Sequence, residues 1–368
     1  MNTSSSMTVS HDSVYGYAEK ASLTIRIRLV VIPVIFIVGF LGNTLTASLF
    51  LGKSLRAKSC SIYLAVKAIS DNGFLVSLLV AWLDFVDVRI FHTQVVCHMT
   101  LYLSYVCGFV SVWSVVLVTI ENYVRICRPS EVRSLCSRYV AKRITILGVV
   151  FGCMLYNYPL WTMDISPPQP HQQRFCHTLH KFERFEVVMT YVDTVLTLVI
   201  PLIIIIILIC IIAVSLVDAS KRRDRLRKSS SYSSVNSTQP KNRSAPTLPH
   251  SKVTKMLLSV SLVFVCLHTP SHAIRMKATL ENLLGQTTVT SQMDRVLQHF
   301  FLVLYYLNFS IYFFIYIICG QNFRKVLKKK INQWYGRKEH VTRTSDCVLN
   351  NRTEDIELET SKNTLDMD

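Results

Sequence analysis

Two side chains of opposite charge, Lys67 and Asp71, lie four positions apart inside an apolar stretch of the sequence. This spacing places both on one face of a helix, where they can form an ion pair. An unpaired charge at the centre of a membrane costs at least ~2.5–3.5 kcal/mol, so each needs a partner if the stretch crosses a bilayer. Two interpretations remain open: the Lys67 ammonium neutralises Asp71 internally, or Lys67 extends along its helix to the inner interface.

A second group of ionisable and polar residues lies near one end of several apolar stretches. Acidic and basic groups that face one cavity from different helices suit a small peptide with a cationic side chain and a polar or amidated end. We expect Asp84 or Asp193 to receive a ligand cation and Arg275 to bind a ligand carbonyl; alternatively, Asp193 and Arg275 pair with each other. The predicted ligand-binding residues are Asp84, Tyr105, Asp193, His272, Arg275, Gln298 and Tyr306.

The short motifs that support catalysis in membrane enzymes do not occur in the sequence. There is no His-Glu-x-x-His metal motif and no Gly-x-Ser-x-Gly nucleophile motif, so we expect no enzyme activity, no catalytic residue, no metal and no cofactor. A transporter is the weaker rival. Only Lys67, Asp71 and Asp193 lie well inside apolar stretches, and the inverted repeat of many transporters is absent.

Hydropathy predicts the elements that must position these residues. Half of the 368 residues are hydrophobic and only 17% are charged, whereas an ordinary soluble domain carries about a quarter charged residues. Seven apolar runs of roughly 20 or more residues are long enough to cross ~30 Å of hydrocarbon. We therefore predict an all-α membrane protein with a bundle of seven transmembrane helices, at about 27–51, 61–83, 99–120, 144–163, 187–217, 253–276 and 296–319.

The positive charges predict the orientation of the chain. The net charge is +17, and 29 of the 40 lysine and arginine residues face the cytosol if the N-terminus is outside. Because basic residues are enriched in cytoplasmic loops, we predict a multi-pass plasma membrane protein with its C-terminus in the cytoplasm. The basic runs adjoin apolar spans, which indicates the lipid bilayer and not nucleic acid as their partner. Residues 1–25 contain no apolar leader, so the first span must act as the insertion signal.

Composition divides the sequence into segments. We predict an extracellular tail at 1–25, a seven-span domain at 26–320, an amphipathic juxtamembrane helix at 321–335 and a disordered cytoplasmic tail at 336–368. Within the domain, the Ser, Asn and Pro-rich stretch 229–249 cannot bury a core and is predicted to be disordered. The 321–335 helix is typical of one that lies along an anionic inner leaflet, because lysines surround an apolar face made of Phe323, Val326, Leu327 and Ile331.

Two kinds of covalent modification are expected outside the cell. Asn2 heads the only glycosylation motif in an outside segment, and the matches at Asn236, Asn242 and Asn351 fall in inside segments and should be silent. Of the eleven cysteines, only Cys97 and Cys176 lie in outside segments. Two thiols in an oxidising compartment favour a disulfide, which would connect the second outside loop to the start of the third span.

Inside the cell, Cys319 and Cys347 are candidate acylation sites. The Ser229–Ser234 cluster and the Ser and Thr residues of the tail are candidate phosphorylation sites, which suggests receptor kinases and arrestin as further partners.

Landmark residues occur at characteristic positions in the spans: Gly42-Asn43, Leu64-Ala65, Ser70-Asp71, Cys97, Pro201, Phe264, Pro270, Tyr316 and Phe323-Arg324. Their types and spacing resemble rhodopsin-like (class A) G-protein-coupled receptors over roughly residues 25–335. Segments 102–113 and 270–275 are most similar to invertebrate neuropeptide receptors, a branch similar to FMRFamide, thyrotropin-releasing-hormone and ghrelin receptors. The resemblance implies an extracellular neuropeptide ligand, a heterotrimeric G protein and signalling by helix rearrangement.

Single positions exclude two other branches of that family. Amine receptors carry an Asp one turn into the third helix, where this chain has Ser104. Opsins need a Lys in the seventh helix to bind retinal, and the matching residue here is Tyr306.

The resemblance also implies a polar network within the membrane. In the family, an Asp, a Ser and an Asn hold a sodium ion, and the matching residues here are Asp71, Ser111 and Asn308. Lys67 is an addition to that pattern and makes sodium at Asp71 doubtful. The predicted intramembrane polar network is Asn43, Lys67, Asp71, Ser111 and Asn308.

The switch residues depart from the family pattern. The acid-arginine-aromatic triplet of the third helix reads Glu121-Asn122-Tyr123, so its arginine is absent, and Arg125 points in a different direction. Tyr312-Phe313 replaces the Asn-Pro pair of the seventh helix and removes the proline kink. An atypical or non-coupling receptor is therefore the alternative function. The predicted switch residues are Glu121, Asn122, Tyr123, Phe264, His268, Pro270, Tyr312 and Tyr316.

Overall fold

The described part of the chain in this computed structural model comprises residues 11–55, 58–86, 88, 93–165, 176–233, 250–283 and 292–334. Its contacts divide the protein into two units, residues 1–320 and 321–368. Residues 321–334 of the second unit form a helix. Asn2, Cys347 and the predicted tail at 336–368 lie outside the described residues.

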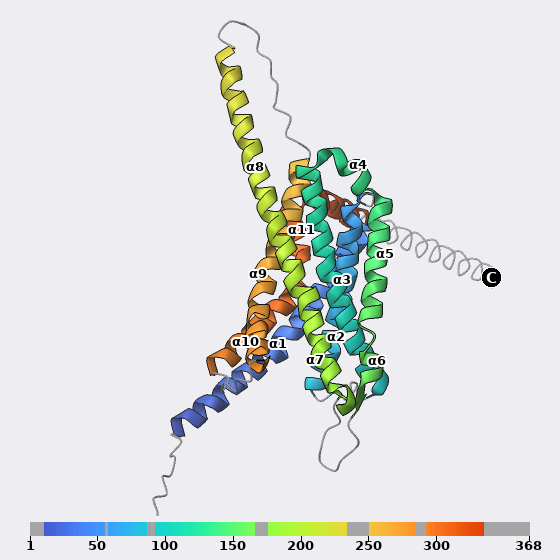
Figure 1. Cartoon of the computed structure of the whole chain (residues 1–368), viewed down its shortest axis with the longest axis vertical. Helices are drawn as coiled ribbons and strands as arrows, with labels where there is room; N and C mark the ends of the chain where they lie inside the picture. Colours follow the sequence, from blue (N-terminus) through green and yellow to red (C-terminus); the bar gives the residue numbers. More distant parts are fainter. Residues whose placement is uncertain are drawn as a thin grey trace, which may run out of the picture. The chain divides into compact units, whose positions relative to one another are not determined.

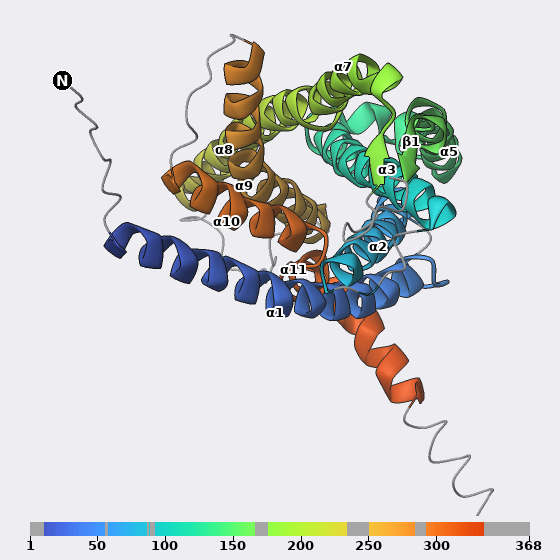
Figure 2. The same cartoon turned by 90° about the horizontal axis from the view of Figure 1, so that it is seen from below.

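Long helices build the first unit (Figure 1). The long helices are α1 (His11–Phe50), α2 (Cys60–Phe85), α3 (Gln94–Cys127), α5 (Arg138–Leu155), α8 (Ile200–Ser233), α9 (His250–Leu283) and α10 (Gln292–Asn308). Shorter elements extend or connect them: η1 (Pro129–Glu131), α4 (Val132–Leu135), α6 (Pro159–Thr162), η2 (His180–Phe182), α7 (Glu183–Thr194), η3 (Val195–Val199) and α11 (Tyr312–Cys319). The central helix is α3, which contacts α2, α5, α8 and α9 (Figure 2).

The helices reproduce the predicted spans in order. Five stretches of the described residues are long and apolar enough to cross a membrane: Arg28–Phe50, Cys60–Phe85, Gln94–Cys127, Arg138–Thr162 and His180–Arg222. The bent pair Leu297–Asn308 and Tyr312–Cys319 makes a sixth if it is one span, and Lys255–Ser271 of α9 is a shorter apolar helix. Together these stretches account for all seven predicted spans.

Two helices continue beyond the predicted membrane spans into polar sequence. The first helix begins at His11, so part of the tail predicted at 1–25 is helical. Similarly, α8 continues to Ser233, so residues 229–233 of the stretch predicted to be disordered are helical. Lys and Arg are good helix formers, and the basic run that follows the apolar span extends the helix. Residues 234–249 lie outside the described part of the chain.

A π-helical turn, η3, joins α7 to α8 and has a cause in the sequence. The Ile200 N–H donates to the Val195 carbonyl, five residues back. In this register the next donor would be residue 201, which is a proline and has no N–H. The Leu196 carbonyl therefore lacks that backbone donor, and the Trp113 indole N–H donates to it at 3.1 Å. The turn thus fixes α8 to the central helix α3.

The pair α10 and α11 bends by 57° although the sequence lacks the proline of the family pattern. The expected loss of the kink is therefore wrong. At the bend, the backbone N–H groups of Phe309 and Ser310 donate to carbonyls three residues back. Asn43 Nδ2 then donates to the Phe309 carbonyl at 2.8 Å, so a neighbouring helix satisfies a backbone group within the bend.

A two-stranded hairpin and a disulfide close one end of the bundle. Strand β1 (Met163–Ile165) pairs antiparallel with β2 (Cys176–Thr178), with Ile165 opposite Cys176. The predicted disulfide is present and joins Cys97 of α3 to Cys176 of β2. It connects the loop before α7 to the start of the central helix.

Candidate functional site

The Lys67 ammonium lies at the centre of a buried polar cluster. It lies 2.8 Å from Asp71 Oδ2 and 3.1 Å from Ser111 Oγ, and the side chains of Lys67 and Asp71 are each 1% exposed. Ser111 donates in turn to Asp71 Oδ1. The ammonium also lies 3.8 Å from the centre of the Tyr312 ring, which is a cation–π contact. Lys67 therefore does not extend to the inner interface, and its geometry corresponds to an internal ion pair.

The cluster continues across the bundle through neutral groups. The Tyr312 hydroxyl donates to Asn308 Oδ1 at 2.7 Å, and Asn308 Nδ2 lies 2.9 Å from His268 Nε2. With the amide as donor, that ring nitrogen is unprotonated. His268 stacks on Phe264 with ring centroids 4.1 Å apart. We call this chain, Lys67, Asp71, Ser111, Tyr312, Asn308 and His268, the Lys67 network; it links α2, α3, α11, α10 and α9.

A second polar centre lies where the C-terminal end of α5 meets the last turn of α7. Asp193 is 7% exposed and accepts a hydrogen bond from the Tyr156 hydroxyl at 2.8 Å. The Tyr105 ring stacks on Tyr156 with ring centroids 5.6 Å apart, and the Tyr158 ring lies 5.7 Å from Tyr105. A carboxylate beside stacked phenol rings is an environment that attracts a cation. We call Asp193, Tyr105, Tyr156 and Tyr158 the Asp193 cluster.

The remaining predicted ligand residues are spread over other helices. Tyr306 lies 6.4 Å from Phe74 by ring centroids, Asp84 is in the last turn of α2 and Gln298 is exposed on α10. The side chains of His272 and Arg275 lie outside the described residues, so the predicted pairing of Asp193 with Arg275 stays untested. Of the seven predicted residues, only Tyr105 and Asp193 belong to the Asp193 cluster.

Toward the opposite end of α3, Glu121 binds Arg125, which lies four residues further along the helix and not at position 122, where the family has its arginine. The guanidinium of Arg125 donates to Glu121 Oε1 through Nε at 2.9 Å and also through Nη2. Ser59 donates to the same carboxylate oxygen at 2.7 Å and receives a bond from Arg125. The arginine one turn further along thus occupies the position of an ion-pair partner for Glu121, and Ser59 ties α3 to the start of α2.

Asn122, in contrast, is buried without a partner. It is 1% exposed, and neither its amide oxygen nor its amide nitrogen forms a hydrogen bond with the described residues. A buried unsatisfied amide costs about 1–3 kcal/mol, so among the described residues nothing offsets the burial of Asn122 near the C-terminal end of α3. Hydrogen bonds with Tyr123, the neighbour of Asn122, and with Glu131 raise the pKa of the Arg128 guanidinium, and the bond with Tyr123 contributes most.

Sequence reasoning missed three residues of these centres: Tyr156, Tyr158 and Ser59. The two tyrosines follow α5 in the sequence Tyr156-Asn157-Tyr158, and amphipathic aromatic residues at the end of a span are typical of a membrane interface. That signal could have identified them. Ser59 has no comparable signal, because its role depends on how α2 packs against α3.

A family model described as "7 transmembrane receptor (rhodopsin family)" matches residues 42–316. The matched range contains the Lys67 network, the Asp193 cluster and Glu121 with Arg125.

Individual relatives match over shorter segments. The gastrin/cholecystokinin type B receptor of Rattus norvegicus is 30% identical over 173 residues, which cover 46% of this chain and 37% of the relative. Its counterpart in Canis lupus familiaris is 33% identical over 144 residues, covering 38% and 31%. The FMRFamide peptide receptor frpr-18 of Caenorhabditis elegans is 26% identical over 137 residues, covering 34% and 31%. The chain thus spans about a third of the length of these relatives.

Proposed function

Because the family model covers most of its length, the chain belongs to the rhodopsin family of seven-transmembrane receptors, and we propose that it is a receptor for an extracellular neuropeptide-type ligand. It is a multi-pass membrane protein of a receptor family and not of an enzyme family. The observation that carries the ligand class is the similarity to receptors named for gastrin, cholecystokinin and FMRFamide peptides. In this proposal the N-terminus is outside and a G protein binds at the cytoplasmic end.

The Asp193 cluster supports a peptide with a cationic side chain. The Tyr156 hydroxyl donates a hydrogen bond to the Asp193 carboxylate, and a carboxylate that accepts such a bond is a suitable partner for a ligand cation. The stacked rings of Tyr105 and Tyr156 add apolar and cation–π contacts. The proposal assigns Asp193 to the ligand cation, and it keeps Asp84, His272, Arg275, Gln298 and Tyr306 as further ligand contacts.

The function is tested by screening the full-length chain in cells against amidated and sulfated peptide libraries, with calcium, cyclic-AMP and arrestin readouts. We expect an active peptide with a Lys or Arg side chain. Asp193→Asn should weaken it by on the order of 10–100-fold, because a hydrogen bond to a charged group contributes about 1.5–3 kcal/mol. An analogue in which an uncharged side chain replaces the cation should lose sensitivity to Asp193→Asn.

The matched control is Tyr156→Phe, which removes the hydrogen bond to Asp193 but keeps the carboxylate. We expect it to change potency much less than Asp193→Asn. If charge reversal at Asp193 left the potency of the cationic peptide unchanged, Asp193 would have to be removed from the ligand site.

A second candidate, an atypical receptor with weak or no G-protein coupling, is favoured by Asn122, whose amide has no hydrogen-bond partner among the described residues. Asn122→Arg restores the arginine of the family pattern and should raise coupling if the native residue attenuates it. Asn122→Ala is the control. It removes an amide that has no described partner, so stability should not fall and coupling should stay at the native level. If the native protein, Asn122→Arg and Asn122→Ala coupled equally, Asn122 would have no effect on coupling.

A further inference from the structure

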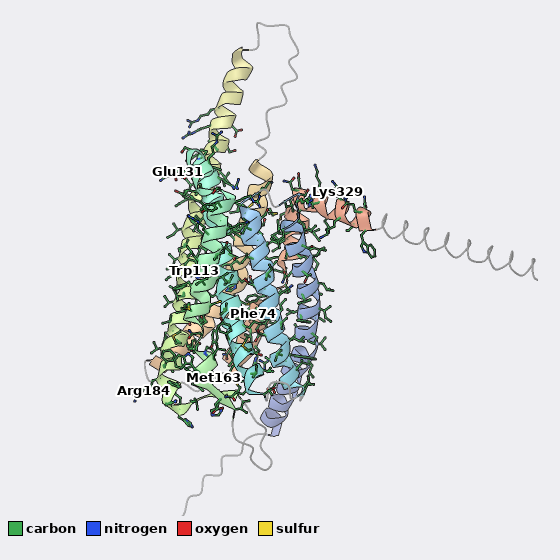
Figure 3. All side chains as sticks on the ribbon, turned by 90° about the vertical axis from the view of Figure 1, so that its right-hand side faces the viewer. Phe74, Trp113, Glu131, Met163, Arg184 and Lys329 are labelled. Atoms are coloured by element: carbon green, nitrogen blue, oxygen red, sulfur yellow. A yellow bond between two sulfur atoms is a disulfide. The ribbon has the colours of Figure 1, made fainter. Side chains whose placement is uncertain are left out.

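A groove of about 360 Å³ lies between α3 and α5, apart from the Lys67 network and the Asp193 cluster. Binding sites for small molecules have volumes of roughly 300–1,000 Å³. In Figure 3, Trp113 lies at mid-height of the bundle, between Glu131 at one end and Met163 at the other. The groove is therefore at the depth of the hydrocarbon. Its walls include Phe109, Trp113, Leu117, Ile144, Gly148 and Phe151.

Two glycines of α5 show that the groove widens from one turn to the next. A Cβ atom at Gly152 would lie 2.9 Å from the Phe109 ring, so the helices are in close contact there. A Cβ atom at Gly148, four residues earlier on the same face, would meet nothing within 4 Å. The space between α3 and α5 therefore opens toward the start of α5, as a wedge that a flexible chain can enter.

The groove opens toward lipid. Ile144, Leu147 and Phe151 contribute to its wall and are 39%, 68% and 53% exposed, within a helix that is long and apolar enough to span the membrane. Apolar side chains exposed along such a helix face hydrocarbon. A molecule in the groove must then come from the bilayer.

Polar groups without a partner continue from the groove toward the start of α5. Thr145 Oγ1 and Arg138 Nε are buried atoms that form no hydrogen bond with the described residues, and Thr145 lines the groove. Arg138, Lys142 and Thr145 are spaced by four and three residues, so they form one stripe on the helix. Lys142 is exposed, and α5 contains no acidic residue to balance these charges.

We infer that this groove binds an anionic phospholipid, with an acyl chain between α3 and α5 and its phosphate against Arg138, Lys142 and Thr145. The stripe supplies two cations and a hydroxyl donor, which match the charge and the acceptor oxygens of a phosphate. Phosphatidylcholine has the same phosphate, but its quaternary ammonium cancels the net charge and is repelled by the two cations, and a sterol has no phosphate. Arg138 begins α5 at the end that faces the cytosol in the proposed orientation of the receptor, so the lipid would belong to the inner leaflet.

Brominated acyl chains quench tryptophan fluorescence at short range, and Trp113 lines the groove. The full-length chain is prepared with Trp82, Trp161 and Trp334 replaced by Phe, so that Trp113 is the sole tryptophan. It is placed in phosphatidylcholine nanodiscs that contain an equal fraction of either brominated phosphatidylserine or brominated phosphatidylcholine. We expect the serine lipid to quench Trp113 with an apparent preference on the order of tenfold, because two basic residues attract it.

Matched pairs of variants test separately whether the acyl chain occupies the groove and whether the phosphate binds the basic stripe. Gly148→Phe fills the groove and should abolish the selective quenching, whereas Ile146→Phe, at a position 61% exposed outside the groove, should not. Arg138→Gln with Lys142→Gln should remove the preference for the serine lipid. Arg143→Gln, whose guanidinium lies over the Tyr139 ring at 4.2 Å, should keep it. Equal thermal unfolding midpoints for Gly148→Phe and Ile146→Phe establish that both variants are folded.

Equal quenching by the two phospholipids, or stronger quenching by a brominated sterol than by the serine lipid, would overturn the inference. Loss of the preference in Arg143→Gln would overturn the assignment of the phosphate to the stripe. Nanodiscs present the same lipids to both faces and no peptide is added, so the result is independent of orientation and of ligand. A negative result in this quenching assay would not bear on the proposed receptor function. Conversely, a peptide screen that finds no agonist would not bear on the lipid site.

Discussion

At the scale of single residues, one ammonium group organises the interior of the bundle. Lys67 contacts a carboxylate, a hydroxyl and an aromatic ring that come from α2, α3 and α11. Taking a charge out of water costs several kcal/mol, and only a close ion pair with additional hydrogen bonds offsets that cost. Lys67 and Asp71 meet both conditions, so each is stable only while the other is present.

Lys67→Met should therefore destabilise the receptor by about 3–5 kcal/mol, because it leaves the Asp71 carboxylate buried without its cation. A sodium ion can then neutralise Asp71, so the thermal unfolding midpoint of this variant should rise when sodium replaces choline in the buffer. The midpoint of the native protein should not depend on that exchange. Both are measured on purified protein in detergent.

The control is Lys67→Met combined with Asp71→Leu, in which no buried charge remains. Replacing a buried ion pair by apolar residues is often neutral, so the double variant should be more stable than Lys67→Met alone and indifferent to sodium. A single variant that unfolds at the native midpoint in both buffers would show that the ammonium does not neutralise Asp71.

The contact between Lys67 and Asp71 could be predicted because both residues lie about one turn apart on the same helix. Lys67 and Asp71 are four residues apart in one helix, and a helix brings such residues together whatever surrounds them. The bond between Tyr156 and Asp193 joins two elements, and the bond between Ser59 and Glu121 joins residues 62 positions apart. Such contacts depend on the relative rotation of packed helices, which no short sequence pattern specifies.

At the scale of elements, the bend between α10 and α11 shows how a neighbouring helix can replace a missing proline. Asn43 of α1 donates to the Phe309 carbonyl, and Gly39, one turn earlier in α1, lets Ser310 approach closely. The sequence predicted a straighter helix because it was judged from its own residues alone. The cause of the bend lies partly on α1, more than 260 residues away.

Gly39→Ala should destabilise the receptor by about 1–3 kcal/mol, since overpacking at a close helix contact forces the backbone to shift. A Cβ atom there would lie 2.6 Å from Leu75 Cδ1 and 2.7 Å from Ser310 Cβ. The matched control is Gly148→Ala in α5, where a Cβ atom has open space. It should be neutral or stabilising by about 0.4–1 kcal/mol, because alanine restricts the unfolded chain.

Thermal unfolding of the two variants in the same detergent measures the difference. If Gly39→Ala and Gly148→Ala shift the midpoint equally, the approach of α1 to Ser310 does not contribute to stability.

At the scale of the whole molecule, the net charge of +17 is explained by the proposed orientation, in which 29 of the 40 lysine and arginine residues face the cytosol. The number and order of the helices could be predicted from hydropathy because each span must bury its own backbone hydrogen bonds in hydrocarbon. Helix ends in the aqueous phase obey no such rule. For that reason hydropathy does not give the ends of α1 and α8, which continue through polar residues to His11 and Ser233.

The predicted orientation has a direct test. In cells that glycosylate secreted proteins, the chain should carry a glycan at Asn2, and Asn2→Gln should remove the mass shift seen on glycosidase treatment. Substitutions at Asn236, Asn242 and Asn351 should have no effect, because these sites face the cytosol in the proposed orientation. A glycan at Asn351 would show that the C-terminus is outside.

The π-helical turn at Val195–Val199 sets the rotation of α7 relative to α8 about their common helix axis. A residue advances an α-helix by about 100°, and a π-turn accommodates one residue more than the α-helical repeat. Asp193 lies before this turn, and Ser215, whose hydroxyl is 3.2 Å from Cys127 of α3, lies after it. Because of this extra residue, α7 can direct the Asp193 carboxylate toward the end of α5 while α8 keeps its own alignment with α3. Deletion of one residue from this turn would rotate the side chains of α7 by about 100° relative to those of α8, although the sequences of both helices would be unchanged.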